Sequence, residues 1–182
     1  DRSDQNVVHS VVVDTALEAD GAGDLTSALN GEAAVAYTMD SDGDLANTIS
    51  DVELYAGKVG GTTQKLTAND ISEQNPQFAA VDGTDTLMWF ADGQLYTTAA
   101  LSDGTALDGC EDLSSDYRLI HWHDQTVLLC AVGRSNSTQL QLYNLSSSTI
   151  GKPVSLYNGD RYLSSFSVCQ DGRDLLLPYT QV

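Results

Sequence analysis

Short apolar runs separated by turn residues fill most of the chain, and this pattern predicts β-strands. The clearest stretch is residues 75–99, NPQFAAVDGTDTLMWFADGQLYTTA. Its β-branched and aromatic runs suit a pleated sheet, and they are joined by Asp82-Gly83 and Asp92-Gly93. Asp-Gly between such runs is the strongest short-range signal of a hairpin. We therefore expect a meander of antiparallel strands, because loops this short leave no room for a crossover helix.

The same alternation continues on both sides of this stretch, so the predicted fold is all-β. Further strands are expected at Val7–Val13, Ala33–Thr38, Val52–Lys58, Thr63–Thr67, Tyr117–Trp122, Thr126–Val132, Thr138–Leu145, Val154–Tyr157, Tyr162–Cys169 and Asp174–Tyr179. One helical turn is expected at Asp24–Asn30, because Asp24 suits an N-cap and Gly31 suits a helix stop.

The strands group into four-strand units that repeat along a single domain, residues 1–182. The expected units are residues 7–75, 76–116, 117–161 and a partial one at 162–182. A four-strand unit recurring every 40–50 residues or so is the period of β-propeller blades. The alternative is a β-sandwich, in which two sheets also give many short strands with frequent turns.

Several short pieces carry a resemblance to a known class of proteins. PQFAAVDG, SVCQDG, VELY, GQLY and LQLY resemble the repeats of bacterial extracellular β-propeller proteins. The resemblance implies a secreted or cell-surface bacterial protein. GKVGGTTQKL is faintly similar to the sialidase Asp-box, but it lacks the Asp and the closing Trp, so sialidase chemistry is not carried over.

The number of strands predicts an incomplete ring. About three and a half units are present, whereas propellers have roughly four to eight blades. The chain starts at Asp1 without Met, as a processed or excised product would. We expect the apolar strands Val7–Val13 and Leu175–Leu177 to be covered by other parts of a parent protein or by another copy of the chain, because exposed apolar edges invite pairing.

Composition narrows the possible partners. The 26 acidic and 8 basic residues give a net charge of −18, which disfavours nucleic acid and anionic membrane surfaces. No apolar run reaches the roughly 18 residues that span a bilayer, so membrane insertion is not expected. Cys110, Cys130 and Cys169 are too few for a disulfide scaffold and lack metal spacing, so we expect reduced, structural thiols.

One acidic loop is a candidate calcium site. Asp40, Asp42, Asp44 and Asp51 occupy positions 1, 3, 5 and 12 of a run that matches the ligand spacing of calcium loops. Two departures stand against it: Gly43 falls two positions before the usual glycine, and position 12 is Asp rather than Glu. The alternative interpretation is a solvated hairpin loop.

Histidines and aromatic residues offer weaker candidates. His121 and His123 would point to one face of a strand, but zinc needs further ligands, and a polar pair near a turn is the alternative; His9 stands apart. Six aromatic residues either stack on sugar rings or pack between blades: Trp89, Phe90, Tyr96, Trp122, Tyr143 and Tyr157.

The sequence contains no catalytic signature that we recognise. A G-x-S-x-G elbow, a phosphate-binding glycine loop and a Cys/His signature are all missing from the sequence. We therefore expect a non-catalytic module that binds a protein or a glycan. The alternative is a fragment of a glycan-acting, sialidase- or glycosidase-like propeller enzyme, which would cluster acids and aromatic residues at a central mouth.

Overall fold

The described part of the protein consists of β-strands and turns and contains no helix. The computed structural model describes residues 9–12, 28–29, 31–40, 52–109, 113–114, 116–123, 125–134, 137–158, 163–166, 169–171, 174–176 and 179–181. The strands are β1 (His9–Val12), β2 (Ala28–Leu29), β3 (Glu32–Asp40), β4 (Val52–Lys58), β5 (Thr63–Lys65), β6 (Gln74–Val81), β7 (Thr84–Ala91), β8 (Gln94–Thr98), β9 (Thr105–Ala106), β10 (Tyr117–Trp122), β11 (Gln125–Arg134), β12 (Ser137–Asn144), β13 (Val154–Asn158), β14 (Leu163–Phe166), β15 (Cys169–Asp171), β16 (Asp174–Leu176) and β17 (Tyr179–Gln181).

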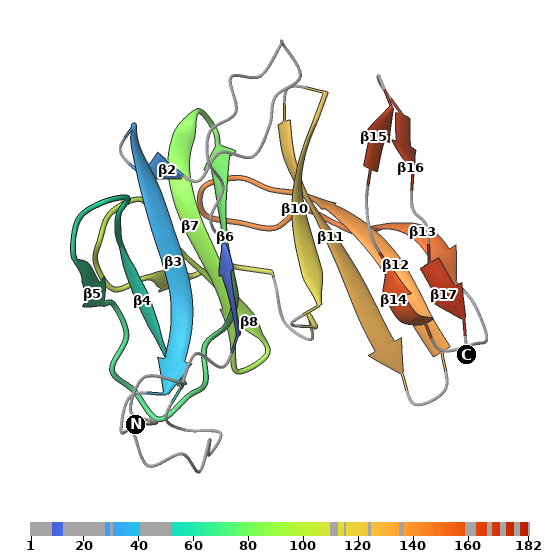
Figure 1. Ribbon diagram of the computed structural model, residues 1–182. Helices are drawn as coiled ribbons and strands as arrows, with labels where there is room; N and C mark the ends of the chain where they lie inside the picture. The colour runs from blue at the N-terminus through green and yellow to red at the C-terminus, as the bar shows by residue number, and fades with distance from the viewer. Residues whose placement is uncertain are drawn as a thin grey trace.

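Three antiparallel sheets follow one another along the chain (Figure 1). The first sheet has the order β1-β3-β4-β5, with β2 paired to β3; the second is β6-β7-β8-β9; the third is β10-β11-β12-β13. None of the three closes on itself. Two further pairs, β14 with β17 and β15 with β16, come from the C-terminal segment. The all-β prediction is confirmed for the described residues.

The Asp-Gly signals form the tight hairpins that the sequence predicted. Val81 pairs with Thr84 across Asp82-Gly83, and the φ angles of those two turn residues are 51° and 75°. The Asp92-Gly93 turn repeats this geometry, with φ angles of 47° and 79°. Positive φ at both central residues gives a turn whose twist matches that of the flanking strands, and Asp and Gly accept it at low cost.

The helical turn expected at Asp24–Asn30 is wrong in its described part. Ala28 and Leu29 form strand β2, and Leu29 pairs with Glu32 across a two-residue loop. The loop sequence is Asn30-Gly31, and Gly31 takes a φ of 73°. Asn-Gly predicts a hairpin more strongly than a single N-cap residue, Asp24, predicts a helix. Burial of Leu29 against the second sheet fixes the strand in place.

Two strand boundaries also differ from expectation. The second unit was expected to start at Pro76, but its first strand, β6, begins two residues earlier, and Pro76 lies where the register with β7 shifts. A bulge tolerates proline because the ladder is interrupted there anyway. The two long C-terminal strands are instead four short ones, nested so that β15 and β16 form the inner pair around the predicted Asp171-Gly172 turn.

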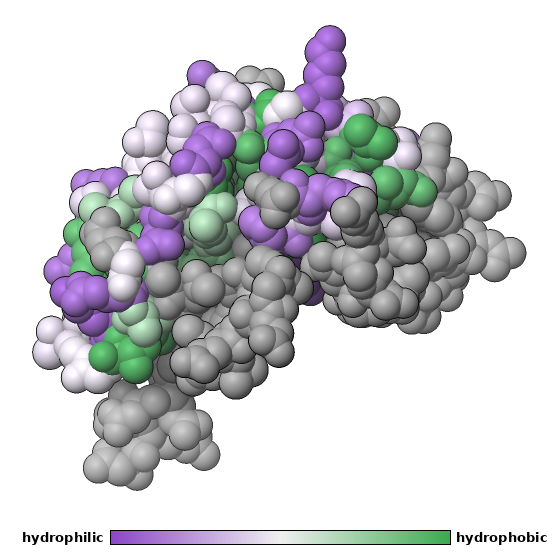
Figure 2. All heavy atoms as spheres, turned by 90° about the horizontal axis from the view of Figure 1, so that it is seen from above, coloured by the Kyte–Doolittle hydropathy of each residue, from purple (hydrophilic) through white to green (hydrophobic). Residues whose placement is uncertain are grey.

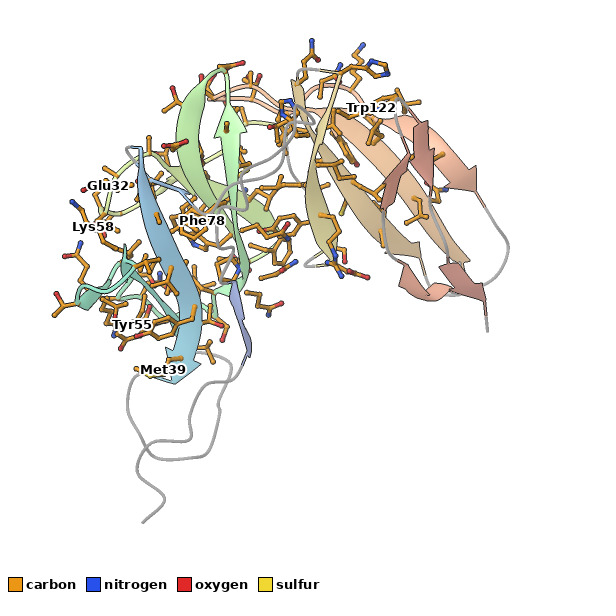
Figure 3. All side chains as sticks on the ribbon, turned by 45° about the horizontal axis from the view of Figure 1, so that its top comes forward. Glu32, Met39, Tyr55, Lys58, Phe78 and Trp122 are labelled. Atoms are coloured by element: carbon orange, nitrogen blue, oxygen red, sulfur yellow. The ribbon has the colours of Figure 1, made fainter. Side chains whose placement is uncertain are left out.

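The sheets pack face to face through side chains that alternate along each strand. Between the first and second sheets lie Ala36, Leu54, Phe78, Leu87 and Trp89, all buried; Figure 3 shows Phe78 in this layer. Between the second and third sheets lie Val81, Met88, Leu95, Leu119, Leu128 and Cys130. Because successive side chains point to opposite faces, strands β6, β7 and β8 of the second sheet supply both layers.

The third strand of each sheet carries a tyrosine on the same relative face. Tyr96 packs on the layer shared with the first sheet, and Tyr143 on the layer shared with the second. Tyr55, on β4, alternates with the buried Leu54 and Ala56, so it lies on the face of the first sheet that points away from the second. There it is half-buried and stacks on Tyr37, with 5.5 Å between ring centroids.

The first strands of the sheets lie side by side. Strand β6 contacts β1 and β3 on one side and β10 on the other. Gln77 of β6 bridges to β10 twice: its Nε2 donates to the Tyr117 carbonyl at 3.0 Å, and its Oε1 accepts from the Leu119 amide at 3.0 Å. The Tyr117 hydroxyl donates back to the Asn75 carbonyl, so side chains tie these two sheets together.

The surface mixes hydrophilic and apolar residues. In Figure 2, hydrophilic residues are spread over the described part of the upper face, with apolar residues between them. Exposed large apolar side chains include Val59, Val154 and Leu156. Among the described residues, no helix has the length and apolar character needed to cross a membrane.

Candidate functional site

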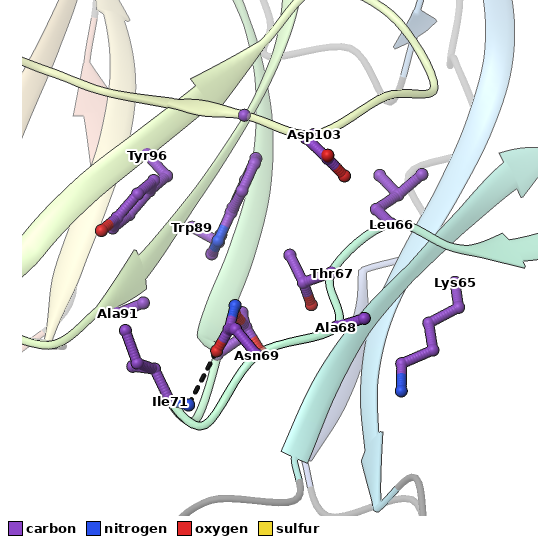
Figure 4. A pocket seen from close by; sticks show the side chains of 12 residues that line it. Lys65, Leu66, Thr67, Ala68, Asn69, Ile71, Trp89, Ala91, Tyr96 and Asp103 are labelled. Atoms are coloured by element: carbon purple, nitrogen blue, oxygen red, sulfur yellow. Dashed lines mark hydrogen bonds between the residues drawn. The ribbon is translucent and has the colours of Figure 1, made fainter.

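A pocket of about 420 Å³ opens between the first and second sheets. It is bounded by the segment that leaves β5 and leads to β6, by β7 and β8, and by the turn before β9 (Figure 4). The lining residues are Lys65, Leu66, Thr67, Ala68, Asn69, Ile71, Glu73, Trp89, Ala91, Tyr96, Asp103 and Gly104. The pocket therefore combines an aromatic wall with several charged and polar groups.

The aromatic wall is a stacked pair. Trp89 of β7 and Tyr96 of β8 are cross-strand neighbours, with ring centroids 5.8 Å apart and planes 19° from parallel. Gly104 lies against the edge of the indole, and a Cβ atom added there would overlap the Trp89 ring. The wall depends on glycine at this position, because even a methyl group would displace the ring.

A buried carboxylate, Glu53, stands behind the pocket and is fully engaged. The residue is only 3% exposed. It accepts hydrogen bonds from the Thr67 hydroxyl at 2.7 Å and the Asn69 amide at 3.1 Å, and it pairs with Lys65 Nζ at 3.3 Å. Thr67 also accepts from the Leu54 amide, which fixes the hydroxyl as the donor to Glu53. A buried charge needs this number of partners to be tolerated.

A second buried carboxyl, Glu73, is only partly satisfied. It is 1% exposed, and its Oε1 accepts from Asn69 Nδ2 at 2.9 Å, whereas its Oε2 has no hydrogen-bond partner. Burial, with a smaller contribution from the nearby charge of Glu53, raises the pKa of Glu73 to about 7, against the opposing effects of the Asn69 and Thr67 side chains. Near neutral pH this carboxyl therefore changes its charge inside the protein.

Asn69 holds the two carboxyls together. Its backbone amide donates a hydrogen bond to Glu53, and its side-chain amide donates one to Glu73. Its side-chain oxygen accepts a hydrogen bond from the Ile71 amide at 2.7 Å. Figure 4 shows this last bond as a dashed line between two of the residues that line the pocket. Such an arrangement can receive a hydrogen-bond donor or a cation at Glu73, and it can pack an apolar or cationic group against the aromatic wall.

The calcium loop lies almost wholly outside the described residues. Asp40 is the last residue of β3, where only its backbone is described, and Asp42, Asp44 and Asp51 are not described. Calcium binding there stays a prediction. Glu53, the acid closest to that loop in sequence, is bound to Lys65, Thr67 and Asn69 instead.

The two histidines lie at a strand end and in the adjoining turn, which agrees with the interpretation as a polar pair near a turn. His121 lies on β10, but His123 is in the turn that follows, with a φ of 50°, so strand alternation does not carry through to it. Its ring packs edge-on against Trp122, with 4.6 Å between centroids. No group of three or more His, Cys, Asp or Glu side chains with metal-binding geometry occurs in the part of the chain that the structure describes.

The six aromatic candidates separate into different environments. Trp89 and Tyr96 line the pocket, whereas Phe90 and Tyr143 are buried between the second and third sheets. Trp122 packs beside His123 and the outer face of the third sheet, and the side chain of Tyr157 is not described. The sequence analysis therefore included both aromatic residues of the pocket, but it did not distinguish them from the aromatic residues of the core.

Glu53 and Glu73 were not among the sequence-based candidates. One signal was available: Glu53 interrupts the otherwise apolar start of Val52–Lys58, and an acid there is buried if the strand is central. Glu73 gave no such signal, since it lies in the polar segment 68–75, where acids are usually solvated. Only the return of that segment alongside β4, through a bond from the Glu73 amide to the Val52 carbonyl, buries it.

A second hollow of about 500 Å³ lies on the second sheet next to the 145–150 turn. It is lined mostly by hydroxyl and small side chains: Thr84, Thr86, Thr97, Thr98, Ala99, Thr105, Ala106, Leu107, Asp108, Ser147 and Ser148. Several of these hydroxyls are already bonded to nearby carbonyls, as Thr86 is to Thr84 and Thr98 to Ala100. This hollow lacks the aromatic wall and the buried carboxyl of the first pocket.

Searches against family models, curated proteins and solved structures found no match to this chain. The site is therefore interpreted from its own residues.

Proposed function

We propose that this chain is the propeller portion of a secreted or surface bacterial protein and acts as a non-catalytic binding module. In this proposal the three sheets are successive blades. Three meanders in chain order, with faces packed and first strands adjacent, support it, since a sandwich needs only two sheets. The equivalent tyrosines Tyr55, Tyr96 and Tyr143 support it further, because each sits on the third strand of its sheet.

The pocket between the first two sheets is the observation that carries the binding function. It joins the stacked Trp89–Tyr96 wall to a buried carboxyl oxygen without a partner. Pockets that combine apolar walls with a few placed polar groups are the usual ligand sites of proteins. Binding without chemistry is favoured because Glu53 is occupied by three donors, which leaves Glu73 without a second carboxylate free to share acid–base work.

A thermal-shift screen tests this proposal. Mono- and oligosaccharides, peptides and small amines are added to the wild type and to Ala68→Phe, which places a ring at the mouth, since Ala68 is exposed and lines the pocket. Ala100→Phe is the matched control, because Ala100 is also exposed but lies outside both hollows.

A ligand that binds only the folded state raises the melting temperature as its concentration rises. We expect at least one compound to raise the melting temperature of the wild type and of the control Ala100→Phe. The same compound should not raise the melting temperature of Ala68→Phe. A full panel without any shift, or shifts that Ala68→Phe retains, would contradict the pocket as the binding site.

One observation favours the second candidate, a fragment of a glycan-acting enzyme. Glu73 lines the pocket with the aromatic wall, Glu53 lies behind it, and the pKa of Glu73 is raised to about 7, as a general acid requires. Hydrolysis of chromogenic aryl glycosides, abolished by both Glu73→Gln and Glu53→Gln, would favour this candidate over the binding module. No turnover by the folded wild type would count against it.

A further inference from the structure

The oxygen Oε2 of Glu73 needs a hydrogen-bond donor, and a ligand of the pocket is the group that can supply it. It is buried without a hydrogen-bond partner, while Oε1 of the same carboxyl is bound to Asn69. A buried acceptor left unsatisfied costs free energy that a suitable donor would restore. One donor atom, rather than a pair, satisfies the site, because only one oxygen of the carboxyl lacks a partner.

The charge around the pocket favours a positively charged donor. Glu73 and Asp103 line the pocket with a single cation, Lys65, which is already paired with Glu53. The whole chain carries a net charge of −18, which raises the local concentration of cations near its surface. A neutral hydroxyl would satisfy the hydrogen bond but would leave the buried carboxylate charge uncompensated.

The aromatic wall favours an organic cation over a metal ion. Tyr96 is partly exposed and stacks on the buried Trp89, so the pair presents an aromatic surface that attracts ammonium groups and packs on aliphatic carbons. Calcium would need about six to eight oxygen ligands, and the described residues hold no cluster of three metal-binding side chains. A guanidinium is also a poor match, because it bonds best to two parallel acceptors and Glu73 offers one.

We propose that the pocket binds a protonated primary amine, which donates to Glu73 Oε2 and lays its carbon chain against Trp89 and Tyr96. This inference rests on the proposed binding function and names the ligand class of the same pocket. Because Glu73 is 1% exposed, the amine approaches it from the side of the exposed lining residues Ala68 and Asn69.

Binding of this kind depends on pH in a defined direction. A protonated Glu73 loses its charge, so amine affinity falls as the pH drops below about 7, the pKa of this carboxyl. The other charged and titratable side chains around it are Glu53 and Lys65 from the first sheet, Asp70 from its own loop, and Tyr96 and Asp103 from the second sheet.

The test uses n-butylamine and its neutral counterpart n-butanol. Tryptophan fluorescence is recorded in the Trp122→Phe background, so that Trp89 is the reporter. At pH 8 we expect saturable binding of butylamine, at least tenfold weaker binding of butanol, and loss of butylamine binding in both Glu73→Gln and Ala68→Phe. Ala100→Phe should bind as the wild type does.

Lowering the pH to 5.5 should weaken butylamine binding roughly thirtyfold, the factor given by a carboxyl with a pKa near 7, because alkylamines stay protonated at both pH values. Equal binding of butanol, pH-independent binding, or no binding of butylamine would overturn the amine assignment. If a saccharide still stabilises the wild type but not Ala68→Phe in the thermal screen, the binding function survives and only the ligand class is wrong.

Discussion

The side chain of Gln77 on β6 accepts a hydrogen bond from the Leu119 amide on β10 at 3.0 Å, although the two residues belong to different sheets. The same side chain donates to the Tyr117 carbonyl at 3.0 Å. Only an amide offers both an acceptor and a donor here, so the second and third sheets are joined by a residue that a carboxylate cannot replace.

Gln77→Glu should therefore destabilise the fold. The carboxylate keeps the acceptor for Leu119 but sets a negative charge against the Tyr117 carbonyl, and we expect a loss of about 1–3 kcal/mol. Urea unfolding measures it. Gln94→Glu, at the Asp92-Gly93 hairpin, makes the same charge change away from the sheet junction and serves as the control; an equal loss in both variants would contradict the bridging role.

Gly104→Ala should disturb the aromatic wall. A Cβ atom at this position overlaps the Trp89 ring, which is buried and cannot move outward freely. We expect a destabilisation of about 1–3 kcal/mol and a changed Trp89 emission in the Trp122→Phe background. Gly61→Ala is the matched control, since the nearest atom to its added Cβ is a Lys58 carbonyl at 3.4 Å. Unchanged emission in Gly104→Ala would argue against the packed wall.

Glu73→Gln should stabilise the protein relative to the wild type, and this gain in stability should be larger at pH 8 than at pH 5. Because the folded-state pKa of Glu73 is raised to about 7, the wild type loses stability as the pH rises from about 4.5 to 7, while its unfolded state ionises more readily. Glutamine removes that loss, on the order of 1–3 kcal/mol at pH 8.

Thermal melts at pH 5 and pH 8 measure this difference. Glu32→Gln, which alters an exposed ion pair with Lys58, should show a much smaller pH dependence. A stability difference between Glu73→Gln and the wild type that is the same at both pH values would mean that Glu73 is ionised at both.

Cys130 should resist alkylation in the native protein. It is fully buried between the second and third sheets, and burial raises the pKa of its thiol to about 11, so little reactive thiolate forms near neutral pH. Iodoacetamide labelling followed by mass spectrometry checks this. The sequence predicts Cys110 to be modified first; rapid modification of Cys130 would contradict its position in the core.

The sequence predicted the strands and hairpins well because their signals are local. Asp82-Gly83 and Asp92-Gly93 impose their turns within four residues, and the short runs Tyr117–Trp122 and Thr126–Val132 are rich in residues that suit strands. Asn30-Gly31 is an equally local signal, and it outweighs the N-cap at Asp24 on which the helical turn at Asp24–Asn30 was predicted. Pro76 falls inside β6 because the bulge that admits it depends on pairing with β7.

The pocket was not predictable in the same way, because its parts come together only through packing of two sheets. Trp89 and Tyr96 were recognised as aromatic candidates, but nothing local distinguishes them from Phe90 or Tyr143. Glu73 becomes a buried, perturbed carboxyl only because the segment after β5 returns beside β4. Its partner Asn69 lies four residues away in a stretch that reads as an ordinary polar loop.

The claim that this pocket binds a ligand without converting it is tested most directly by saturation-transfer NMR on a compound that stabilises the protein. In the Trp122→Phe variant, irradiation of the Trp89 and Tyr96 ring protons should transfer saturation to the ligand. Ala68→Phe should abolish that transfer, and the ligand should be recovered unchanged after prolonged incubation. Transfer that persists in Ala68→Phe, or the appearance of a reaction product, would contradict the account.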